Sequence, residues 1–314
     1  MEESSRERHV LLIVTYNRKE LLKECIHAAC HQTIPYERIV VIDNASTDGT
    51  QEYLRALEGD GRLQVIRESE NLGGAGGFAH GLTAAHALSP DWITIIDDDA
   101  ILRPDFLEQI EAAIQKYGTQ YECFAGVPLT QGIRPGHRRR VMGGLIKKEQ
   151  AVPREEYDLE SFSCDIGSFC GLVIADHLIE KIGVPRKEYF IWYDDTEYCL
   201  RISRYTKILN WNKAVIDHKA PMEQGSNYAA GWKEYYGIRN RIDMSRKHYG
   251  RPTTIYIIFK KRMKSILLQM RLCARGHFAA AAQTRRLYHT AIRDGKKGVL
   301  GLHRIYRPGY HPPE

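Results

Sequence analysis

The feature that most constrains the fold is an alternation of short apolar runs with helix-forming segments over the first hundred residues. The apolar runs, rich in Val, Ile and Leu, occupy residues 9–15, 38–43, 63–67 and 92–96. The helix-forming segments between them occupy residues 19–31, 51–57 and 74–88. Strands and helices that alternate in this way build a parallel sheet covered by helices. The sequence therefore predicts an α/β fold with a mostly parallel central sheet.

Charge divides the chain into an acidic body and a basic C-terminal part. Residues 221–314 contain 19 Lys and Arg against 5 Asp and Glu, a formal charge of +14, whereas the residues before them carry −8. The pattern is mixed after about residue 120 and becomes helical after Pro221. We therefore expect an α/β domain over residues 1–220 and a basic helical region over residues 221–314. Such a tail suits a polyanionic surface, either anionic lipid or nucleic acid.

One segment of the basic part has the spacing of an amphipathic helix. Apolar residues recur three or four positions apart at Ile255, Ile258, Phe259, Met263, Ile266, Leu267 and Met270. The basic residues among them are Lys260, Lys261, Arg262, Lys264 and Arg271. The helix could lie in the plane of an anionic membrane, or pack on the α/β domain with its charges in water. No nucleic-acid-binding motif accompanies the charge, so nucleic acid is not an expected partner.

Cysteine usage and the absence of long apolar runs indicate the compartment. The seven cysteines are odd in number and lack CxxC spacing, which argues against a disulfide framework and a structural zinc site. We expect them to be reduced core thiols. The charged first residues lead directly into a strand, so no secretory signal is expected, and no apolar run reaches the roughly 18 residues that span a bilayer. The expected location is the cytoplasm, including the inner face of the cell membrane.

Polar residues follow three of the four predicted strands. Thr15 to Arg18 come after the first strand, Asp43 and Asn44 at the end of the second, and Asp97 to Asp99 after the fourth. Ligands of open α/β sheets bind at the carboxyl ends of the strands. We therefore expect these side chains to converge in one site.

The acidic triplet Asp97 to Asp99 is a candidate metal site. Three adjacent carboxylates repel one another unless a cation is present. In an extended segment Asp97 and Asp99 point the same way, so both could hold one hard ion such as Mg²⁺ or Mn²⁺, with positions left open for a diphosphate. The alternative is a solvated acidic turn before the helix that begins near Pro104. The position at the end of a buried strand favours the metal.

A glycine-rich segment runs from Asn71 to Phe78, with four glycines in the five positions 73–77. Glycine lets backbone N–H groups approach a phosphate or sugar closely, and the helix that starts here has an N-terminus that favours anions. The segment is therefore a candidate donor-binding loop. A tight turn is the alternative.

A second acidic group, Asp194, Asp195 and Glu197, lies beside aromatic residues at the start of an amphipathic helix. Helix capping could account for it. Paired carboxylates among aromatics also suit general-base catalysis on a sugar hydroxyl, because a neighbouring carboxylate and an apolar wall raise a pKa and aromatic rings stack on sugars. His218, which ends a later apolar run, is a further candidate metal ligand or phosphate donor.

Taken in order, these segments resemble those of inverting family 2 glycosyltransferases of the GT-A fold. The matching blocks are VTYNR at 14–18, VIDNASTDGT at 41–50, NLGGAGGF at 71–78, DDDA at 97–100 and WYDDTEYCLR at 192–201. The resemblance covers about residues 9–220 and is strongest to bacterial galactofuranosyltransferases, with rhamnosyltransferases as close neighbours. It implies that residues 1–220 form a Rossmann-like GT-A domain that binds a nucleotide-sugar. The segment Tyr235 to Asn240 also resembles one near the acceptor side of related transferases.

The resemblance implies roles for individual residues. Contacts to the nucleotide-sugar fall to Thr15, Asn17, Arg18, Asp43, Asn71, Gly74, Asp97 and Asp98. The metal, Mn²⁺ or Mg²⁺, falls to Asp97, Asp99 and His218. The implied base is Asp195, and Trp192 and Asp194 are implied acceptor contacts. Tyr193 separates Trp192 from the carboxylate pair, whereas the family pattern often places Trp directly before it.

The implied reaction is transfer of galactofuranose from UDP-galactofuranose, with inversion, to a glycan or lipid-linked glycan in bacterial cell-surface polysaccharide synthesis. Peripheral membrane association would suit a lipid-linked acceptor. Three alternatives stay open: rhamnose transfer from dTDP-rhamnose, metal-dependent nucleotidyl transfer, and a membrane-docked scaffold with a degenerate site.

Overall fold

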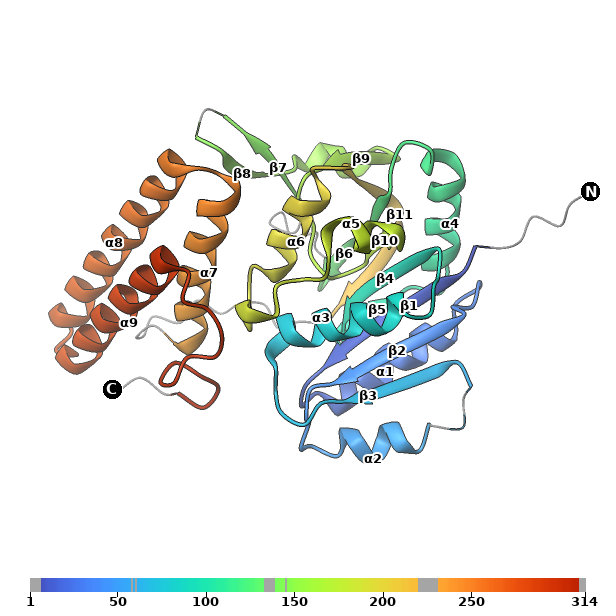
Figure 1. Cartoon of the computed structure of the whole chain (residues 1–314), viewed down its shortest axis with the longest axis horizontal. Helices are drawn as coiled ribbons and strands as arrows, with labels where there is room; N and C mark the ends of the chain where they lie inside the picture. Colours follow the sequence, from blue (N-terminus) through green and yellow to red (C-terminus); the bar gives the residue numbers. More distant parts are fainter. Residues whose placement is uncertain are drawn as a thin grey trace, which may run out of the picture.

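The computed structural model describes residues 7–57, 59, 61–132, 139–144, 146–219 and 231–310. At its centre is a nine-stranded sheet in the order β3-β2-β1-β4-β10-β6-β11-β5, with β9 paired to β11 (Figure 1). The strands of this sheet are β1 (His9–Thr15), β2 (Arg38–Asp43), β3 (Leu63–Arg67), β4 (Trp92–Asp97), β5 (Ala100–Leu102), β6 (Cys123–Thr130), β9 (Ser161–Cys164), β10 (Leu172–Ala175) and β11 (Ile208–His218). A separate antiparallel hairpin is formed by β7 (Arg140–Gly143) and β8 (Lys148–Ala151).

The sheet is mostly parallel, as predicted. Strands β1, β2, β3 and β4 pair in parallel, and β6 and β11 run in the same direction because β10 lies antiparallel between β4 and β6. Within this sheet, among the described strands, β5, β9 and β10 run the other way. The carboxyl ends of β1, β2, β4 and β11 therefore lie at the same edge of the sheet.

Helices cover both faces of the sheet because the strands are apolar on both faces. Along β1, Val10, Leu12 and Val14 belong to one core and Leu11 and Ile13 to the other. The second core is covered by α1 (Lys19–Cys30), α2 (Thr50–Arg55) and α4 (Phe106–Tyr117). The first is covered by α3 (Gly73–His86), α5 (His177–Ile182) and α6 (Asp194–Ile202). Two 3₁₀ turns, η1 (Arg154–Asp158) and η2 (Lys187–Tyr189), complete this part.

The C-terminal part is helical, as predicted, and its three helices pack on one another beside the sheet (Figure 1). They are α7 (Trp232–His248), α8 (Arg251–Ala274) and α9 (Phe278–Lys297). Buried residues of α7 and α9, including Tyr236 and Leu287, belong to the same core as the sheet face under α3. The predicted division at residues 220 and 221 lies outside the described residues, so the two-part division stays a prediction.

The cysteines differ in how deeply they are buried. Five are buried, but Cys30 is half-buried and Cys273 on α8 is exposed, so the prediction of core thiols fails for Cys273.

Among the helices that the structure describes, none is both long and apolar enough to cross a bilayer.

Close packing of α3 on the sheet depends on glycine. A Cβ at Gly81 would lie 2.3 Å from Cδ1 of Leu12 and 3.0 Å from Cγ1 of Ile42. We expect Gly81→Ala to lower the free energy of unfolding by about 1–3 kcal/mol, because extra volume in a packed core forces neighbours to move. Urea denaturation measures this.

The matched control is Gly74→Ala in the same helix, where an added Cβ meets nothing within 4 Å. It should leave stability unchanged or raise it slightly, because alanine favours helices. Equal stability of the two variants would contradict tight packing at Gly81.

Candidate active site

The acidic triplet lies at the sheet edge where four parallel strands end. Asp97 is the last residue of β4 and pairs with Val14 of β1, while Thr15 pairs with Asp43 of β2. His218 ends β11, and the backbone N–H of Lys219 donates to the carbonyl of Asp99 at 2.8 Å. The fold therefore brings residues 15–18, 43, 97–99 and 218 to one edge.

Two of the three carboxylates are buried and accept hydrogen bonds from Thr15 at the end of β1 and Arg18 in the loop after it. Asp98 accepts hydrogen bonds from Oγ1 of Thr15 at 2.7 Å and from Nη1 of Arg18 at 3.1 Å. The same Arg18 nitrogen donates to Oδ2 of Asp99 at 2.7 Å. Asp97 is only partly buried. Arg18 thus supplies positive charge that the clustered carboxylates need.

His218 lies directly against the triplet. Its Nε2 is 3.2 Å from Oδ1 of Asp99, and that buried oxygen accepts no aligned hydrogen bond from the described residues. Nδ1 of His218 lies 3.3 Å from Oγ1 of Thr130, which fixes the ring from its other side. A carboxylate oxygen from the turn between β4 and β5 and a ring nitrogen from the end of β11 are therefore held together, as two ligands of one metal would be.

The two buried carboxyl groups have opposite pKa shifts. Burial raises the pKa of Asp98 despite the charge of Arg18. Burial also acts to raise the pKa of Asp99, but the contacts with His218 and Arg18 outweigh it and lower the pKa. Asp99 is accordingly held as a carboxylate, the form that binds a cation.

The predicted metal ligands fit a cation only in part. Within the part of the chain that the structure describes, no three His, Cys, Asp or Glu side chains are grouped closely enough to hold a metal ion by themselves. Asp99 and His218 adjoin, and Asp97 lies at the same strand end on the more exposed side. A metal here would draw its other ligands from a bound diphosphate or water.

The residues predicted to line the nucleotide are tied to the turn after β2. Asp43 is buried and accepts hydrogen bonds from Nη1 of Arg67 and from the backbone N–H of Ser46, both at 2.9 Å. Oδ1 of Asn17 accepts from the backbone N–H of Thr47 at 2.7 Å. Arg67, at the end of β3, was missed by the sequence analysis, although its position at a strand end was a usable signal.

Most of the glycine-rich segment serves packing. At Gly73, whose φ is +73°, a Cβ would lie 2.0 Å from the carbonyl oxygen of Phe190. At Gly77 it would lie 2.6 Å from Cγ1 of Val14. Oδ1 of Asn71 accepts from the backbone N–H of Gly73 at 2.8 Å. Gly74 alone in this first turn faces open space, so it is the glycine whose backbone a ligand could approach.

The second acidic pair begins α6 after a strained backbone segment. Phe190, Trp192 and Tyr193 all have positive φ angles, between 65° and 69°, which is costly for residues other than glycine. Asp194 is buried, and Asp195 is partly buried with Oδ1 accepting from the backbone N–H of Thr196. Burial, with the neighbouring Asp195 charge, raises the pKa of Asp194 to about 7.

Helix α7 holds the strained segment in place. Nδ2 of Asn240 donates to the carbonyls of Tyr189, Ile191 and Trp192 at 2.9–3.0 Å. The exposed ring of Trp192 also lies against Gly237, where an added Cβ would be 2.9 Å from it. Asn240 lies in the segment Tyr235 to Asn240 that resembles related transferases, but its role here was not predicted from the sequence.

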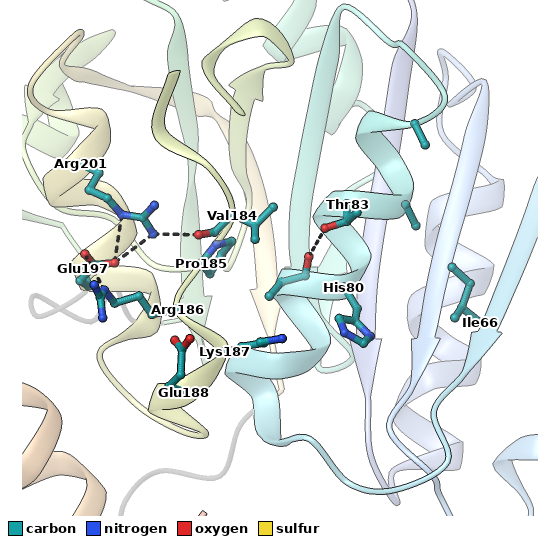
Figure 2. Close-up of a pocket in the computed structure, with 13 residues that line it drawn as sticks. Ile66, His80, Thr83, Val184, Pro185, Arg186, Lys187, Glu188, Glu197 and Arg201 are labelled. Carbon is teal, nitrogen blue, oxygen red and sulfur yellow. Dashed lines mark hydrogen bonds and ion pairs between the residues drawn. The ribbon is translucent and has the colours of Figure 1, made fainter. Parts of the chain in front are cut away.

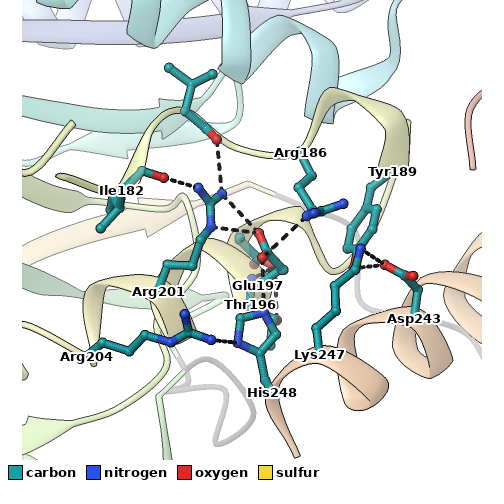
Figure 3. A network of polar contacts seen from close by, with 12 residues as sticks. Ile182, Arg186, Tyr189, Thr196, Glu197, Arg201, Arg204, Asp243, Lys247 and His248 are labelled. Carbon is teal, nitrogen blue, oxygen red and sulfur yellow. Dashed lines mark hydrogen bonds and ion pairs between the residues drawn. The ribbon is translucent and has the colours of Figure 1, made fainter. Parts of the chain in front are cut away.

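An ion-pair network around Glu197 joins α6 to α7 (Figure 3). Glu197 pairs with Arg201 at 3.0 Å and with Nε2 of His248 at 3.1 Å, and Arg186 reaches it at 3.6 Å. Burial acts to raise the pKa of Glu197, but His248, Arg201 and Arg186 outweigh it and lower the pKa. Glu197 therefore stabilises the contact between α6 and α7 through its ion pairs, whereas Asp194 and Asp195 are not part of this network.

A cavity of about 850 Å³ opens between α3 and the loop before η2 (Figure 2). Ala79 and Thr83 form one wall, Val184 and Pro185 the other, and Arg186 lies at its rim. Of the acidic group predicted from the sequence only Glu197 lines it, and none of the residues predicted to bind donor, metal or acceptor does. It is separate from the edge that carries the acidic triplet.

The chain belongs to glycosyl transferase family 2. The model of that family matches residues 10–172, just over half of the 314 residues. The galactofuranosyltransferase GlfT1 of Mycolicibacterium smegmatis is 35% identical over 200 residues, which cover 62% of this chain and 64% of that protein. The match therefore spans less than two thirds of this relative's length. The hexosyltransferase Agl10 of Haloferax volcanii, of low-salt glycan biosynthesis, is 23% identical over 249 residues, 74% of this chain and 73% of that protein.

Solved structures confirm the GT-A fold. The mannosyltransferase PcManGT from Pyrobaculum calidifontis, in complex with GDP-Man and Mn²⁺, aligns with a TM-score of 0.57 over 93% of this chain and 85% of its own, at 17% identity. GalNAc-T7, with UDP, GalNAc and Mn²⁺, aligns with a TM-score of 0.60 over 78% and 48% of the two chains, at 15% identity. At these identities the likeness shows the fold alone.

The raised pKa of Asp194 predicts a stability that depends on pH. Between about pH 4, where the carboxyl of an unfolded chain ionises, and pH 7, the folded state retains a proton that the unfolded state has lost. Stability contributed by this group is therefore greatest at low pH and is lost as the pH rises towards 7. Asp194→Asn removes the titration, so from pH 5 to 8 its free energy of unfolding should fall less than that of the wild type, by about 1 kcal/mol or more.

Urea denaturation at several pH values measures the difference between the two proteins. The matched control is Glu20→Gln on the exposed face of α1, which should follow the wild type. Parallel pH profiles of Asp194→Asn and the wild type would contradict a raised pKa.

Proposed function

We propose that the protein is a metal-dependent, inverting glycosyltransferase that uses a UDP-sugar, with UDP-galactofuranose as the donor. The observation that carries the proposal is the contact between Asp99 and His218 at the carboxyl edge of a family 2 domain. The choice of donor rests on the 35% identity to a galactofuranosyltransferase. The acceptor would be a glycan or lipid-linked glycan in bacterial cell-surface polysaccharide synthesis.

In this proposal Asp97, Asp99 and His218 hold Mn²⁺ or Mg²⁺. When bound, the ion offsets the charge of the donor diphosphate and stabilises it as a leaving group. In the structure, Arg18 pairs with both buried aspartates, Asp98 and Asp99. Its half-exposed guanidinium would turn partly towards the diphosphate, while Thr15 keeps Asp98 in place.

The remaining donor contacts follow from the geometry of the edge. Asn17 and Asp43 would lie beside the nucleoside, since both are fixed by the turn after β2. Asn71 and Gly74 would lie along the diphosphate and sugar, because the open first turn of α3 presents backbone N–H groups and the positive end of the helix dipole.

Asp195 is the proposed base. It removes the proton of an acceptor hydroxyl as that oxygen bonds to the anomeric carbon, while the bond from this carbon to the diphosphate oxygen breaks and UDP leaves. Asp194, buried beside it with a raised pKa, keeps the pair from carrying two full charges. Trp192, exposed before the pair, offers a face for the acceptor sugar.

The proposal has two enzyme alternatives that products distinguish. A rhamnosyltransferase would prefer dTDP-rhamnose, and a nucleotidyltransferase would release pyrophosphate in place of free UDP. The proposed location is the cytoplasm at the inner face of the membrane, where a lipid-linked acceptor would be reached by peripheral association.

A donor screen tests the proposal. Wild-type protein is incubated with Mn²⁺ and UDP-galactofuranose, UDP-galactopyranose or dTDP-rhamnose, with galactan oligosaccharides as acceptors, and products are identified by mass spectrometry. We expect galactofuranose transfer with release of UDP, reduced by about 10²–10⁴-fold in Asp195→Asn because general-base catalysis is lost.

Glu20→Gln is the matched control and should retain full activity. Preference for dTDP-rhamnose would overturn the donor assignment, and release of pyrophosphate would overturn the reaction. Full activity of Asp195→Asn would overturn the assignment of the base.

A further inference from the structure

Helix α8 exposes an apolar face to solvent. At about 100° per residue, its exposed apolar side chains fall within an arc of about 120°. They are Ile255, Phe259, Met263, Ile266, Leu267 and Met270, each at least 40% exposed. The opposite side, with Ile257, Ser265 and Leu272, is buried against α7 and α9. The helix lies at the outer edge of the molecule (Figure 1). These six residues define the exposed stripe of α8.

The charge on α8 is of one sign. The 24-residue helix contains six Lys and Arg and no Asp or Glu. By the same helical geometry, Arg262 borders the apolar stripe on one side and Lys260 and Lys264 border it on the other. An apolar arc between two rows of long cationic side chains is the arrangement of a helix that lies in a membrane interface.

A groove between α8 and α9 continues the stripe. It encloses about 590 Å³, and its cationic lining residues are Arg262, Arg285, Arg293, Lys296 and Lys297. No carboxylate is among its lining residues in the described part of the chain. Arg262, which borders the stripe, and Ile266, which is part of it, both line the groove. A ligand seated there would meet positive charge on one side and apolar surface on the other.

The positive charge of the groove is largely uncompensated. On the opposite border of α8, Lys264 pairs with Glu234 at 3.0 Å, and Lys261 lies 3.9 Å from the same carboxylate. In the groove, Arg293 pairs with Asp294 at 3.0 Å. Among the ion pairs of the described residues, none involves Arg262, Arg285, Lys296 or Lys297. An anion in the groove would therefore meet positive charge from both α8 and α9.

We propose that this groove binds the phosphate headgroup of an anionic phospholipid and that the stripe of α8 enters the interface beside it. Arg262 and Arg285 would contact phosphate oxygens, for which guanidinium geometry is suited. Ile266 and its neighbours on the stripe would contact acyl chains. The site lies on α8 and α9, so it requires neither donor nor metal and does not rest on the proposed function.

Charge favours a lipid over two other occupants. A second copy of the chain would bring two helices that carry only positive charge into contact, which like-charge repulsion disfavours. A nucleic acid would satisfy the cations of the groove but would leave the six apolar side chains in water. Anionic lipid matches both features.

Vesicle sedimentation with the full-length protein tests the proposal. Vesicles of phosphatidylcholine alone are compared with vesicles containing about one third phosphatidylglycerol. We expect the wild type to bind the anionic vesicles at least about tenfold more tightly, and Arg262→Gln/Arg285→Gln to lose about tenfold or more, because each interfacial cation contributes to binding. Phe259→Ala/Leu267→Ala should also weaken binding, since less apolar surface is inserted.

The control pair is Arg55→Gln/Lys187→Gln, which removes two exposed cations from the α/β domain and should bind like the wild type. All variants should retain the UDP affinity of the wild type, which separates this site from the nucleotide site. Inorganic phosphate at millimolar concentration should not displace the protein from anionic vesicles.

Four outcomes would overturn the proposal: equal binding to neutral and anionic vesicles, no vesicle binding, complete displacement by free phosphate, or tighter binding to a DNA duplex than to anionic vesicles. A dimer in analytical ultracentrifugation that Phe259→Ala/Leu267→Ala abolishes would also overturn it, by assigning the stripe to a second copy.

Discussion

Compensation of clustered negative charge at the end of β4 is the constraint on which the site depends. Asp98 and Asp99 are buried, where unpaired charge is costly. The chain meets this cost with Arg18 from the loop after β1 and His218 from the end of β11. These partners are about 80 and 119 positions away in sequence. Parallel pairing of β1 with β4 brings Arg18 to the triplet, and antiparallel pairing of β5 with β11, which places His218 opposite Ala100, brings His218 there. The topology of the sheet therefore determines which charged side chains meet at the triplet.

The second acidic pair, at the start of α6, is held in place by α7 from the C-terminal part of the chain. Asn240 holds three carbonyls of a segment with positive φ angles, and Glu197 is tied to His248. The backbone before Asp194 is therefore fixed by a helix some 40 residues later. Strain that is maintained by buried hydrogen bonds is characteristic of functional sites. Helix α7 accordingly supports the acidic pair, although it belongs to the C-terminal helical part of the chain.

The sequence predicted the elements well where local pattern decides them. The first three strands match residue for residue, because their apolar runs are continuous and are ended by polar residues. Arg67 and Asn240 were missed because their roles depend on partners that only the register and packing create. Glycines were predicted to serve ligand approach, yet Gly73 and Gly77 are required by nearby side chains and backbone. A sequence cannot separate these two uses of glycine without knowing what faces the missing Cβ.

The central claim is that Asp97, Asp99 and His218 form a metal-assisted site for a nucleoside diphosphate. Isothermal titration of UDP, with and without Mn²⁺, tests it most directly in the wild type and in His218→Ala. The account predicts UDP binding that is strengthened by Mn²⁺ in the wild type and much less in the variant. Wild-type binding of UDP that is absent, or the same with and without Mn²⁺, would contradict it.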